Sequence, residues 1–380
     1  MPVPPTSTAT SMPALQLLKP GGMLAFISSN KWFRAAYGKN LRAHIADTCA
    51  VRSITDFGDL PVFESATAYP MIFVAQKKYS TPPRQNSMAN GTRFTRPRSL
   101  DDPYPDVRAV IQQQGEFLPS DALNGAEWSL TDAATASRLR GMSAVGVPLG
   151  EYVRGQIYRG VLTGFNTAFV LDGATRARLI ADDAKSAEII KPLVVGKDIH
   201  KWRIIDRDRW LIVTKIGVEI ARYPAIFAHL QQWQEQLEKR WDKGRHWWEL
   251  RSCDYYAAFD QPKIIYPVIV KSPTFAFDET GAFTNDKGYI IPVSDFYLLG
   301  VLNSSSAWEI IASVCSPLRG GFFEMRAAHL AKIPIPDAPT SERTAIADLV
   351  QHCLDARGGG CAAWEAEIDA RVARLYGLGT

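Results

Sequence analysis

The sequence contains no grouping of cysteines or histidines of the kind that holds a metal ion. Its five cysteines are odd in number and far apart, with no CxxC or Cys/His spacing, so zinc is not indicated. The six histidines form no HExxH-like pair. We interpret the cysteines as buried or incidental thiols and predict no metal site.

Long apolar runs are also missing. None approaches the roughly 20 residues that a membrane-spanning helix needs, and the Pro-, Ser- and Thr-rich start lacks the cationic and apolar regions of a secretory signal. These absences predict a cytoplasmic protein that binds no membrane. We expect residues 1–13 to be disordered.

Charge of one sign is not in large excess. The chain has 43 Lys and Arg against 39 Asp and Glu, a net charge of +4, which does not by itself indicate a nucleic-acid partner. The distribution says more. Between Lys19 and Arg52 there are six basic residues and one acidic residue, Asp47.

Residues 14–80 alternate between helical and strand patterns, as in an α/β fold. Strands are predicted at Met23–Ser28, Val51–Phe57 and Met71–Lys78, with a helix between the first two. Met23–Ser28 is a continuous apolar run, typical of a strand buried on both faces.

Glycines interrupt a run of β-forming residues between 151 and 170, which suggests bulges or the close approach of another backbone. Polar residues suited to phosphates and base edges lie among them: Arg154, Arg159, Thr163 and Asn166. A helix should follow, closing with KPLVVGKDIHKW, where Lys197, Lys201 and Arg203 gather.

Further on, apolar residues from Arg222 recur at three- and four-residue steps and predict one buried helical face. They are Ile226, Leu230, Trp233, Leu237 and Trp241. The aromatic residues that follow, from Trp247 to Tyr256, are interpreted mostly as core.

The pieces RGVLTGFNTAFVLD and IIKPLVVGKDIHKW resemble the opening of the C-terminal specificity domain of Taq-like adenine DNA methyltransferases. That domain also occurs in single-chain type IIG restriction–modification enzymes. Similar text follows in the family's order, including WWEL, PKIIYP and AKIPIP. The resemblance implies a mixed α+β target-recognition domain at residues 148–338 and a C-terminal helical hairpin at 339–380.

Two pieces within residues 14–80, LLKPGGMLAFISSNKWF and DFGDLPVFESATAYP, resemble the C-terminal end of a class I (Rossmann-like) methyltransferase catalytic domain. Residues 81–147 would then be a linker, whose arginines either line DNA phosphates or are simply solvated. In that family an aromatic at the position of Phe63 forms a wall of the pocket for a flipped-out adenine. The alternative is an ordinary loop aromatic in the core.

The motifs that would carry the family's chemistry are missing. No glycine-containing turn with a following acidic residue, as S-adenosylmethionine binding requires, precedes Leu15. No Asn/Asp-Pro-Pro-Tyr/Phe turn is present, and no PD-(D/E)xK-like nuclease cluster stands out. The family uses S-adenosylmethionine, but this chain is expected to bind none and to be inactive alone, as a C-terminal fragment or half of a split enzyme.

The resemblance implies DNA target recognition within an adenine-specific DNA methyltransferase of a restriction–modification or phage-defence system, with double-stranded DNA as partner. One alternative is half of a split methyltransferase, active only with a chain that supplies the N-terminal half. Another is an α/β protein without a DNA role. Arg319, before Gly320 and Gly321, is a candidate phosphate nest or a plain turn. The predicted DNA-binding residues are Arg159, Thr163, Asn166, Lys197, Lys201, Arg203 and Arg319.

Overall fold

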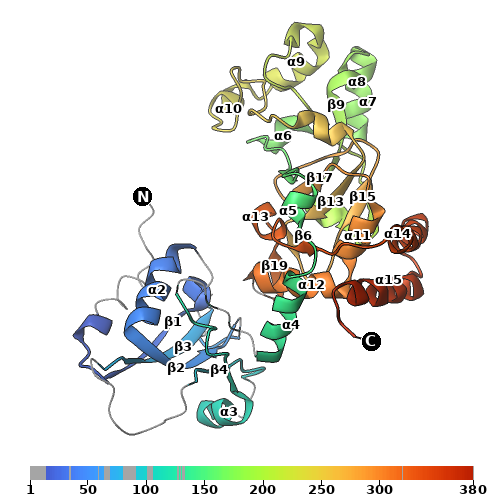
Figure 1. Ribbon diagram of the computed structural model, residues 1–380. Coiled ribbons are helices and arrows are strands. Elements are labelled where there is room, and N and C mark those ends of the chain that lie inside the picture. Colours follow the sequence, from blue (N-terminus) through green and yellow to red (C-terminus); the bar gives the residue numbers. More distant parts are fainter. Residues whose placement is uncertain are drawn as a thin grey trace. The chain divides into compact units, whose positions relative to one another are not determined.

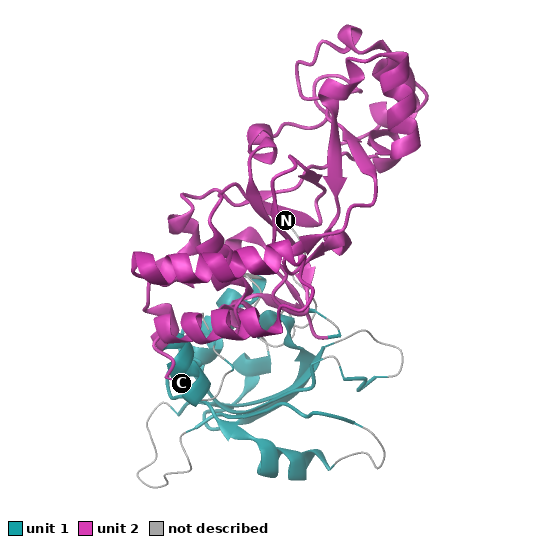
Figure 2. Ribbon diagram, turned by 90° about the vertical axis from the view of Figure 1, so that its right-hand side faces the viewer, with its two compact units in different colours: residues 1–140, 318–320 teal, residues 141–317, 321–380 magenta. Residues whose placement is uncertain are grey.

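The computed structural model describes residues 14–33, 36–58, 60–63, 69–79, 91–100, 106–125, 128, 130, 133–318 and 320–379. They belong to two compact units (Figures 1 and 2). Unit 1 comprises Met1–Arg140 with Leu318–Gly320, and unit 2 comprises Gly141–Pro317 with Gly321–Thr380. No helix in the described part of the chain is long and apolar enough to cross a membrane.

Unit 1 is built on one five-stranded sheet in the order β1-β3-β2-β4-β5. β3 runs antiparallel to both β1 and β2, so these two strands run parallel to each other, and β4 is parallel to β2. The three predicted strands of this region are confirmed. The bounds are β1 Met23–Ser29, β2 Cys49–Asp56, β3 Pro70–Lys77, β4 Arg93–Thr95 and β5 Glu116–Phe117.

The predicted helix between the first two strands is shorter than expected. Two 3-10 turns, η1 (Asn30–Phe33) and η2 (Ala36–Gly38), precede α2 (Lys39–Thr48). The backbone is tight here, since a Cβ on Gly38 would lie 2.0 Å from the carbonyl oxygen of Trp32. The turns deliver Trp32 and Phe33 into the core of unit 1, where their rings pack against Phe73.

The apolar run of β1 predicted a strand buried on both faces, and this prediction is wrong. Its residues alternate between exposed and half-buried, and Met23 and Ile27 keep 52% and 47% of their surface exposed. Leu24 packs against the core of unit 1, whereas Met23, Ala25 and Ile27, on the other face, are exposed. β1 also stands at the end of the sheet order, with one paired neighbour.

The segment predicted as a linker contains regular structure. β4 and β5 extend the sheet, and the segment also contains two helices, α3 (Val107–Gln114) and α4 (Ala133–Ser143). Its arginines make internal contacts: Arg93 donates to the carbonyls of Ile111 and Gln112. Strand pairing uses backbone groups, so a segment of polar composition can still add strands to a sheet.

Unit 2 contains two four-stranded sheets, in the orders β16-β9-β12-β8 and β15-β13-β17-β7. β9 and β12 pair antiparallel, whereas β16 joins β9 in parallel. In order, the strands are β7 Tyr158–Arg159, β8 Val170–Asp172, β9 Ile190–Val194, β12 Arg209–Ile212, β13 Lys263–Pro267, β15 Ala276–Asp278, β16 Phe283–Thr284 and β17 Gly288–Ile291.

Shorter strands and turns complete unit 2. The strands are β6 Val147–Pro148, β10 Ile199–His200, β11 Arg203–Ile204, β14 Ile269–Val270, β18 Ser316–Leu318, β19 Phe322–Glu324 and β20 Pro334–Ile335. The turns and short helices are α5 Leu149–Tyr152, α6 Asn166–Phe169, α8 Ser186–Ile189, η3 Gly196–Asp198, η4 Ile220–Arg222, η5 Tyr256–Asp260 and α13 Ala327–Leu330.

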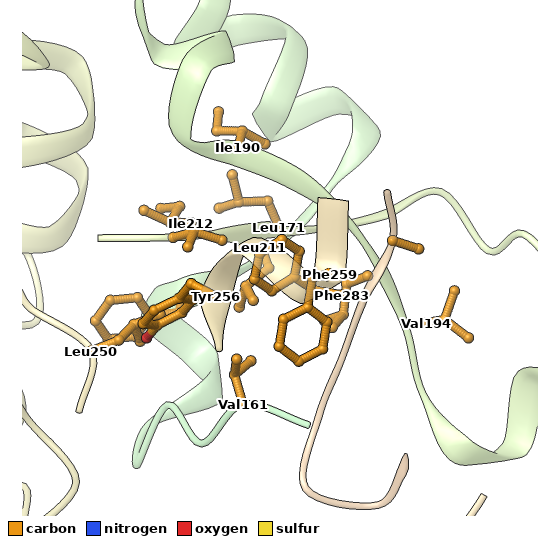
Figure 3. Packing of buried hydrophobic residues seen from close by; sticks show 14 of the residues in the cluster. Val161, Leu171, Ile190, Val194, Leu211, Ile212, Leu250, Tyr256, Phe259 and Phe283 are labelled. Carbon is orange, nitrogen blue, oxygen red and sulfur yellow. The ribbon is translucent and has the colours of Figure 1, made fainter. Parts of the chain in front are cut away.

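The core of unit 2 contains side chains from both sheets, and Figure 3 shows a part of it around Leu211, Ile212 and Phe283 of the first sheet. Leu211 and Ile212 of β12 are fully buried, and the rings of Phe259 and Phe283 stack with centroids 4.5 Å apart. α7 (Gly173–Asp182) and α9 (Pro224–Gln231) add Leu179 and other apolar side chains. Aromatic packing of this kind dominates core energetics.

The long helix predicted from Arg222 is broken. α9 ends at Gln231, and a second short helix, α10 (Gln234–Glu238), follows the turn at Trp233. Leu237 is still buried in the core after the break, but Trp241 no longer lies on the buried helical face that the sequence predicted. The expectation that Trp241 is buried is therefore wrong: its side chain is 100% exposed.

Four helices pack together near the C-terminal end of the sequence: α11 Phe296–Asn303, α12 Ser305–Val314, α14 Thr340–Asp355 and α15 Ala362–Leu375. Capping side chains set the starts of α11 and α12, since Asp295 accepts from the amide of Leu298 and Ser304 from that of Ala307. Gly300 allows α14 to approach α11, because a Cβ there would lie 2.7 Å from Ile346.

A buried ion pair joins β13 to β15. The ammonium of Lys263 lies 2.5 Å from the carboxylate of Asp278, and both side chains are inaccessible to solvent. The ammonium also donates to the carbonyls of Phe259 and Gln261, and the carboxylate accepts from the amide of Ala282. Full hydrogen bonding compensates for the desolvation of the two charges.

Replacing Asp278 with Asn should lower the free energy of unfolding by about 3–5 kcal/mol, because the ammonium of Lys263 would remain buried without its counter-charge. Chemical denaturation followed by tryptophan fluorescence measures this loss. The control is Asp182→Asn, which breaks the surface pair with Arg178 and should cost less than about 1 kcal/mol. Equal losses in the two variants would contradict the buried pair's role.

Candidate nucleic-acid interface

The segment from 151 to 170 is less strand-like than its sequence predicted. Tyr152 ends α5, only Tyr158–Arg159 forms a strand, and Asn166–Phe169 is the helix α6. The predicted close backbone approach is present at Gly160, where a Cβ would lie 2.0 Å from the carbonyl oxygen of Asn285. This glycine lets the segment cross the turn between β16 and β17.

Arg159 lies on β7, and its guanidinium is held by that same turn. Its Nη2 lies 3.3 Å from Oδ2 of Asp286, a carboxylate that also binds Lys287 at 3.1 Å. The hydroxyl of Tyr255 donates to the Arg159 carbonyl at 3.0 Å. Asp286 thus partly neutralises two cations that remain exposed.

Thr163 and Asn166 are linked to each other. The Thr163 hydroxyl donates to Oδ1 of Asn166 at 2.6 Å and accepts from the amide of Phe165 at 3.2 Å. Thr163 is only 5% exposed, whereas Asn166 is exposed. Thr163 therefore orients Asn166. The amide nitrogen of Asn166 makes no hydrogen bond to any described residue.

A buried arginine that the sequence did not single out fixes this loop. The Arg240 guanidinium donates to the carbonyls of Thr163, Trp247 and Glu249, and it lies 4.7 Å from the centre of the Phe169 ring. Burial lowers the pKa of Arg240 to about 10, a shift that nearby Asp242 opposes. The side chain stays a cation at neutral pH and joins α6 to the chain after α10.

Glu249 is the second buried charge of this region. Its carboxylate accepts from the backbone amides of Gly217, Arg245 and His246 at 2.6–3.0 Å. Burial raises the pKa of Glu249, but the three amides and the nearby His246 outweigh it, so the pKa lies below its ordinary value. The only sequence signal for Arg240 and Glu249 is their position as charges within a run of tryptophans.

The cations of the KPLVVGKDIHKW segment divide into two kinds. Lys197 on η3 and Arg203 on β11 are exposed and make no hydrogen bond or ion pair with described residues. Lys201 instead binds Glu365 of α15 at 3.0 Å. The predicted helix is present in its earlier part, as α7 and α8, but its closing segment forms β9 instead. The turn after β9 approaches the β16–β17 turn, since a Cβ on Gly196 would lie 2.7 Å from the Lys287 carbonyl.

In unit 1, Phe63 follows two tight turns beyond β2 and keeps 45% of its surface exposed, so it is not a core residue. The carboxylate of Asp56 closes the end of β2 by accepting from Asn30 at 2.8 Å and from the amide of Gly58 at 3.0 Å. It also pairs with Arg96 at 3.2 Å. Arg319 lies outside the described residues, and the glycines after it both have positive φ.

Two families match parts of the chain. Residues 191–335 match the TaqI-like C-terminal specificity domain, and residues 12–63 match the Eco57I restriction-modification methylase family. The chain is 26% identical to the type II methyltransferase M.PaeR7I of Pseudomonas aeruginosa, with 96% of this chain and 63% of the relative covered. It is 25% identical to M.XhoI of Xanthomonas vasicola, with 85% and 60% covered.

Among solved structures, the type IIL restriction-modification enzyme MmeI in complex with DNA shares the fold, with a TM-score of 0.65 at 13% identity. The alignment covers 99% of this chain and 49% of that one. The chain is thus related to the DNA methyltransferases of restriction–modification systems. More particularly, it carries a TaqI-like C-terminal specificity domain preceded by a segment of an Eco57I-type methylase, as the sequence resemblance predicted. It spans about three-fifths of the length of these two methyltransferase relatives.

Replacing Glu249 with Gln should lower stability at neutral pH by about 1–3 kcal/mol, because three buried amides lose a charged acceptor. A carboxylate with a depressed folded pKa stabilises the protein above its unfolded pKa, and this stabilisation disappears as the pH falls through the folded pKa. The stability gap between the two proteins should therefore narrow on acidification. Denaturation curves at several pH values measure it, with exposed Glu235→Gln as control; a gap that widens toward low pH would contradict this.

Proposed function

We propose that this chain performs DNA target recognition within an adenine-specific DNA methyltransferase of a restriction–modification system. The specificity-domain match over residues 191–335 is the observation that carries the proposal. It falls in unit 2, where Asn166, Lys197 and Arg203 expose polar groups without internal partners. A cytoplasmic location belongs to the same proposal, because the target is duplex DNA.

The exposed polar groups divide the work of binding. Lys197 and Arg203 would neutralise phosphates and fix the position of the duplex. Asn166 has one amide oxygen engaged by Thr163, so its free amide nitrogen would donate to an acceptor on a base edge. Arg159 would exchange Asp286 for a phosphate, and Arg319 would add a further phosphate contact. Lys201, held by Glu365, would contribute mainly by holding its loop against α15.

Unit 1 would supply the edge of a class I methyltransferase sheet, with Phe63 as one wall of the pocket for the flipped adenine. The methylase match over residues 12–63 and the exposed ring of Phe63 support this assignment. An extruded base loses its stacking partners and needs a flat apolar surface to replace them. We further propose the division into residues 14–80, 81–147, 148–338 and a C-terminal helical hairpin at 339–380, which α14 and α15 would form.

The described residues of unit 1 do not fit a complete S-adenosylmethionine site. β1 leads into Ser29 and Asn30 rather than a glycine turn, and the carboxylate at the end of β2, Asp56, is engaged by Asn30, Gly58 and Arg96. A ribose-binding carboxylate must be free to accept from hydroxyls. We therefore assign no methyl-transfer step to this chain alone.

The alternative is half of a split methyltransferase, active only with a chain that supplies the N-terminal half. The exposed apolar face of β1, and its edge to which no second strand pairs among the described residues, favour it, because a strand with unpaired backbone groups readily accepts another strand. S-adenosylmethionine would then bind to the partner. In this alternative the chain still recognises DNA, so both versions share the first of the two tests below.

The purified chain should bind duplex DNA with an affinity that falls steeply with salt, because each neutralised phosphate releases counterions. Fluorescence anisotropy with a labelled duplex of mixed sequence, repeated over a series of salt concentrations, gives the slope. Lys197→Ala should make the slope shallower by about one unit, whereas exposed Lys185→Ala, outside the predicted set, should leave it unchanged. An affinity that stays flat from low to moderate salt would rule out the recognition role.

The split-enzyme alternative is tested by mixing the chain with the part of M.PaeR7I that it does not match. Labelled S-adenosylmethionine should then transfer its methyl group to DNA only when both chains are present. Phe63→Ala should lower the rate about tenfold or more, because a stacking surface for the base is lost, and Phe63→Tyr should retain most of it. If no methylation occurs under conditions where the chain binds DNA, the split alternative fails and the recognition role stands.

A further inference from the structure

Trp241 is fully exposed in a loop that follows α10, although the sequence pattern placed it on a buried stripe. An indole is among the most unfavourable side chains to leave in water, because it carries a large apolar surface. Single exposed apolar residues are nevertheless common on protein surfaces. The exposure of Trp241 alone therefore does not indicate a ligand; the anchoring of its loop and the charges beside it must indicate one as well.

The backbone on both sides of Trp241 is anchored. The preceding residue is Arg240, whose buried guanidinium binds three carbonyls from two segments, that of Thr163 and those of Trp247 and Glu249. The following residue is Asp242, whose carbonyl accepts from Arg240 at 3.3 Å and whose carboxylate binds Arg251 at 3.1 Å. Farther along, Glu249 closes the loop by binding the amides of Arg245 and His246. The loop thus presents the indole from a fixed backbone.

This loop lies beside the segment that carries Asn166. Gly164 of that segment lies against the loop, since a Cβ there would lie 3.1 Å from Cβ of Asp242 and 3.2 Å from Cδ of Arg240. Its φ of +67° and this close approach both favour glycine. In Figure 1, α6 and α10 lie in the same end of unit 2. The indole and the free amide of Asn166 therefore project from adjoining segments.

The charge around Trp241 suits a polyanion. In the stretch 239–251, the buried pair Arg240 and Glu249 is engaged by backbone groups. The other charged side chains of this stretch are the exposed cations Lys239, Lys243, Arg245 and Arg251 and the half-buried Asp242. Lys239 pairs with Glu235 at 2.6 Å and Arg251 with Asp242 at 3.1 Å, which leaves Lys243 and Arg245 without a carboxylate partner among the described residues. The Arg245 side chain makes no contact of hydrogen-bond or ion-pair type with described residues. An aromatic among cations is the combination that binds nucleic acid through stacking and phosphate contacts together.

We propose that Trp241 contacts the duplex directly, packing its indole against a base or sugar next to the base edge that Asn166 contacts. This inference rests on the proposed DNA-recognition function. The indole would supply a share of affinity that does not depend on salt, because an apolar contact releases no counterions. Lys243 and Arg245 would supply the salt-dependent share from the same loop.

The two shares can be separated by measuring binding of the full chain to a labelled duplex of mixed sequence at several salt concentrations. Trp241→Ala should weaken binding about tenfold at every salt concentration and leave the slope unchanged. Trp241→Phe should retain most of the affinity. The double variant Lys243→Ala/Arg245→Ala should instead make the slope shallower by about one to two units. The melting temperature of Trp241→Ala should equal that of the wild type, because the indole is exposed in the free protein.

Trp364→Ala serves as the control, since this tryptophan lies on α15, with its ring tilted by 37° against that of His352 at a centroid distance of 5.2 Å; its DNA affinity should be unchanged. Wild-type affinity in Trp241→Ala, alongside salt-dependent binding by the wild type, would overturn this inference and leave the recognition function standing. A dimer that dissociates in Trp241→Ala, seen by sedimentation, would also overturn it by assigning the indole to a second copy. If the wild type binds no duplex, the recognition function fails first.

Discussion

The buried guanidinium of Arg240 holds together the part of unit 2 that we assign to DNA contact. A cation is transferred out of water only where other groups replace its hydration, and here backbone carbonyls and the face of Phe169 do so. Because those carbonyls belong to Thr163, Trp247 and Glu249, segments nearly 90 residues apart in sequence become one rigid surface. Asn166 and Trp241 project from this surface.

The same principle separates structural charges from those available to a ligand. Lys263, Asp278 and Glu249 are buried and hydrogen-bonded. Their interactions therefore stabilise strands and loops of the fold. Lys197 and Arg203 remain exposed without internal partners. Arg159 and Lys201 stand between the two kinds, since each is accessible yet holds a carboxylate. For these two, any DNA phosphate must compete with an existing surface ion pair, which is worth little in water.

In unit 1 the strand at the end of the sheet order, β1, differs in burial from its neighbour β3. β3 lies between two parallel strands and is well buried, whereas β1 leaves Met23 and Ile27 exposed. β1 is apolar on both faces, yet one face is exposed to solvent. This is consistent with the match to an Eco57I-type methylase over residues 12–63. It is also the reason that we retain the split enzyme as an alternative.

Local pattern alone predicted β1, β2 and β3 of unit 1 and the close approach at Gly160, since apolar runs and glycine placement act over a few residues. The family resemblance, too, was carried by short pieces of sequence. Tertiary structure decided which charged and aromatic side chains are free. The Thr163 hydroxyl is hydrogen-bonded to Asn166, and the Arg240 guanidinium is buried against backbone carbonyls. Trp241 is exposed because α10 ends at Glu238, before the helical stripe reaches it. These outcomes depend on partners distant in sequence, because burial and hydrogen bonding are set by which segments meet in space.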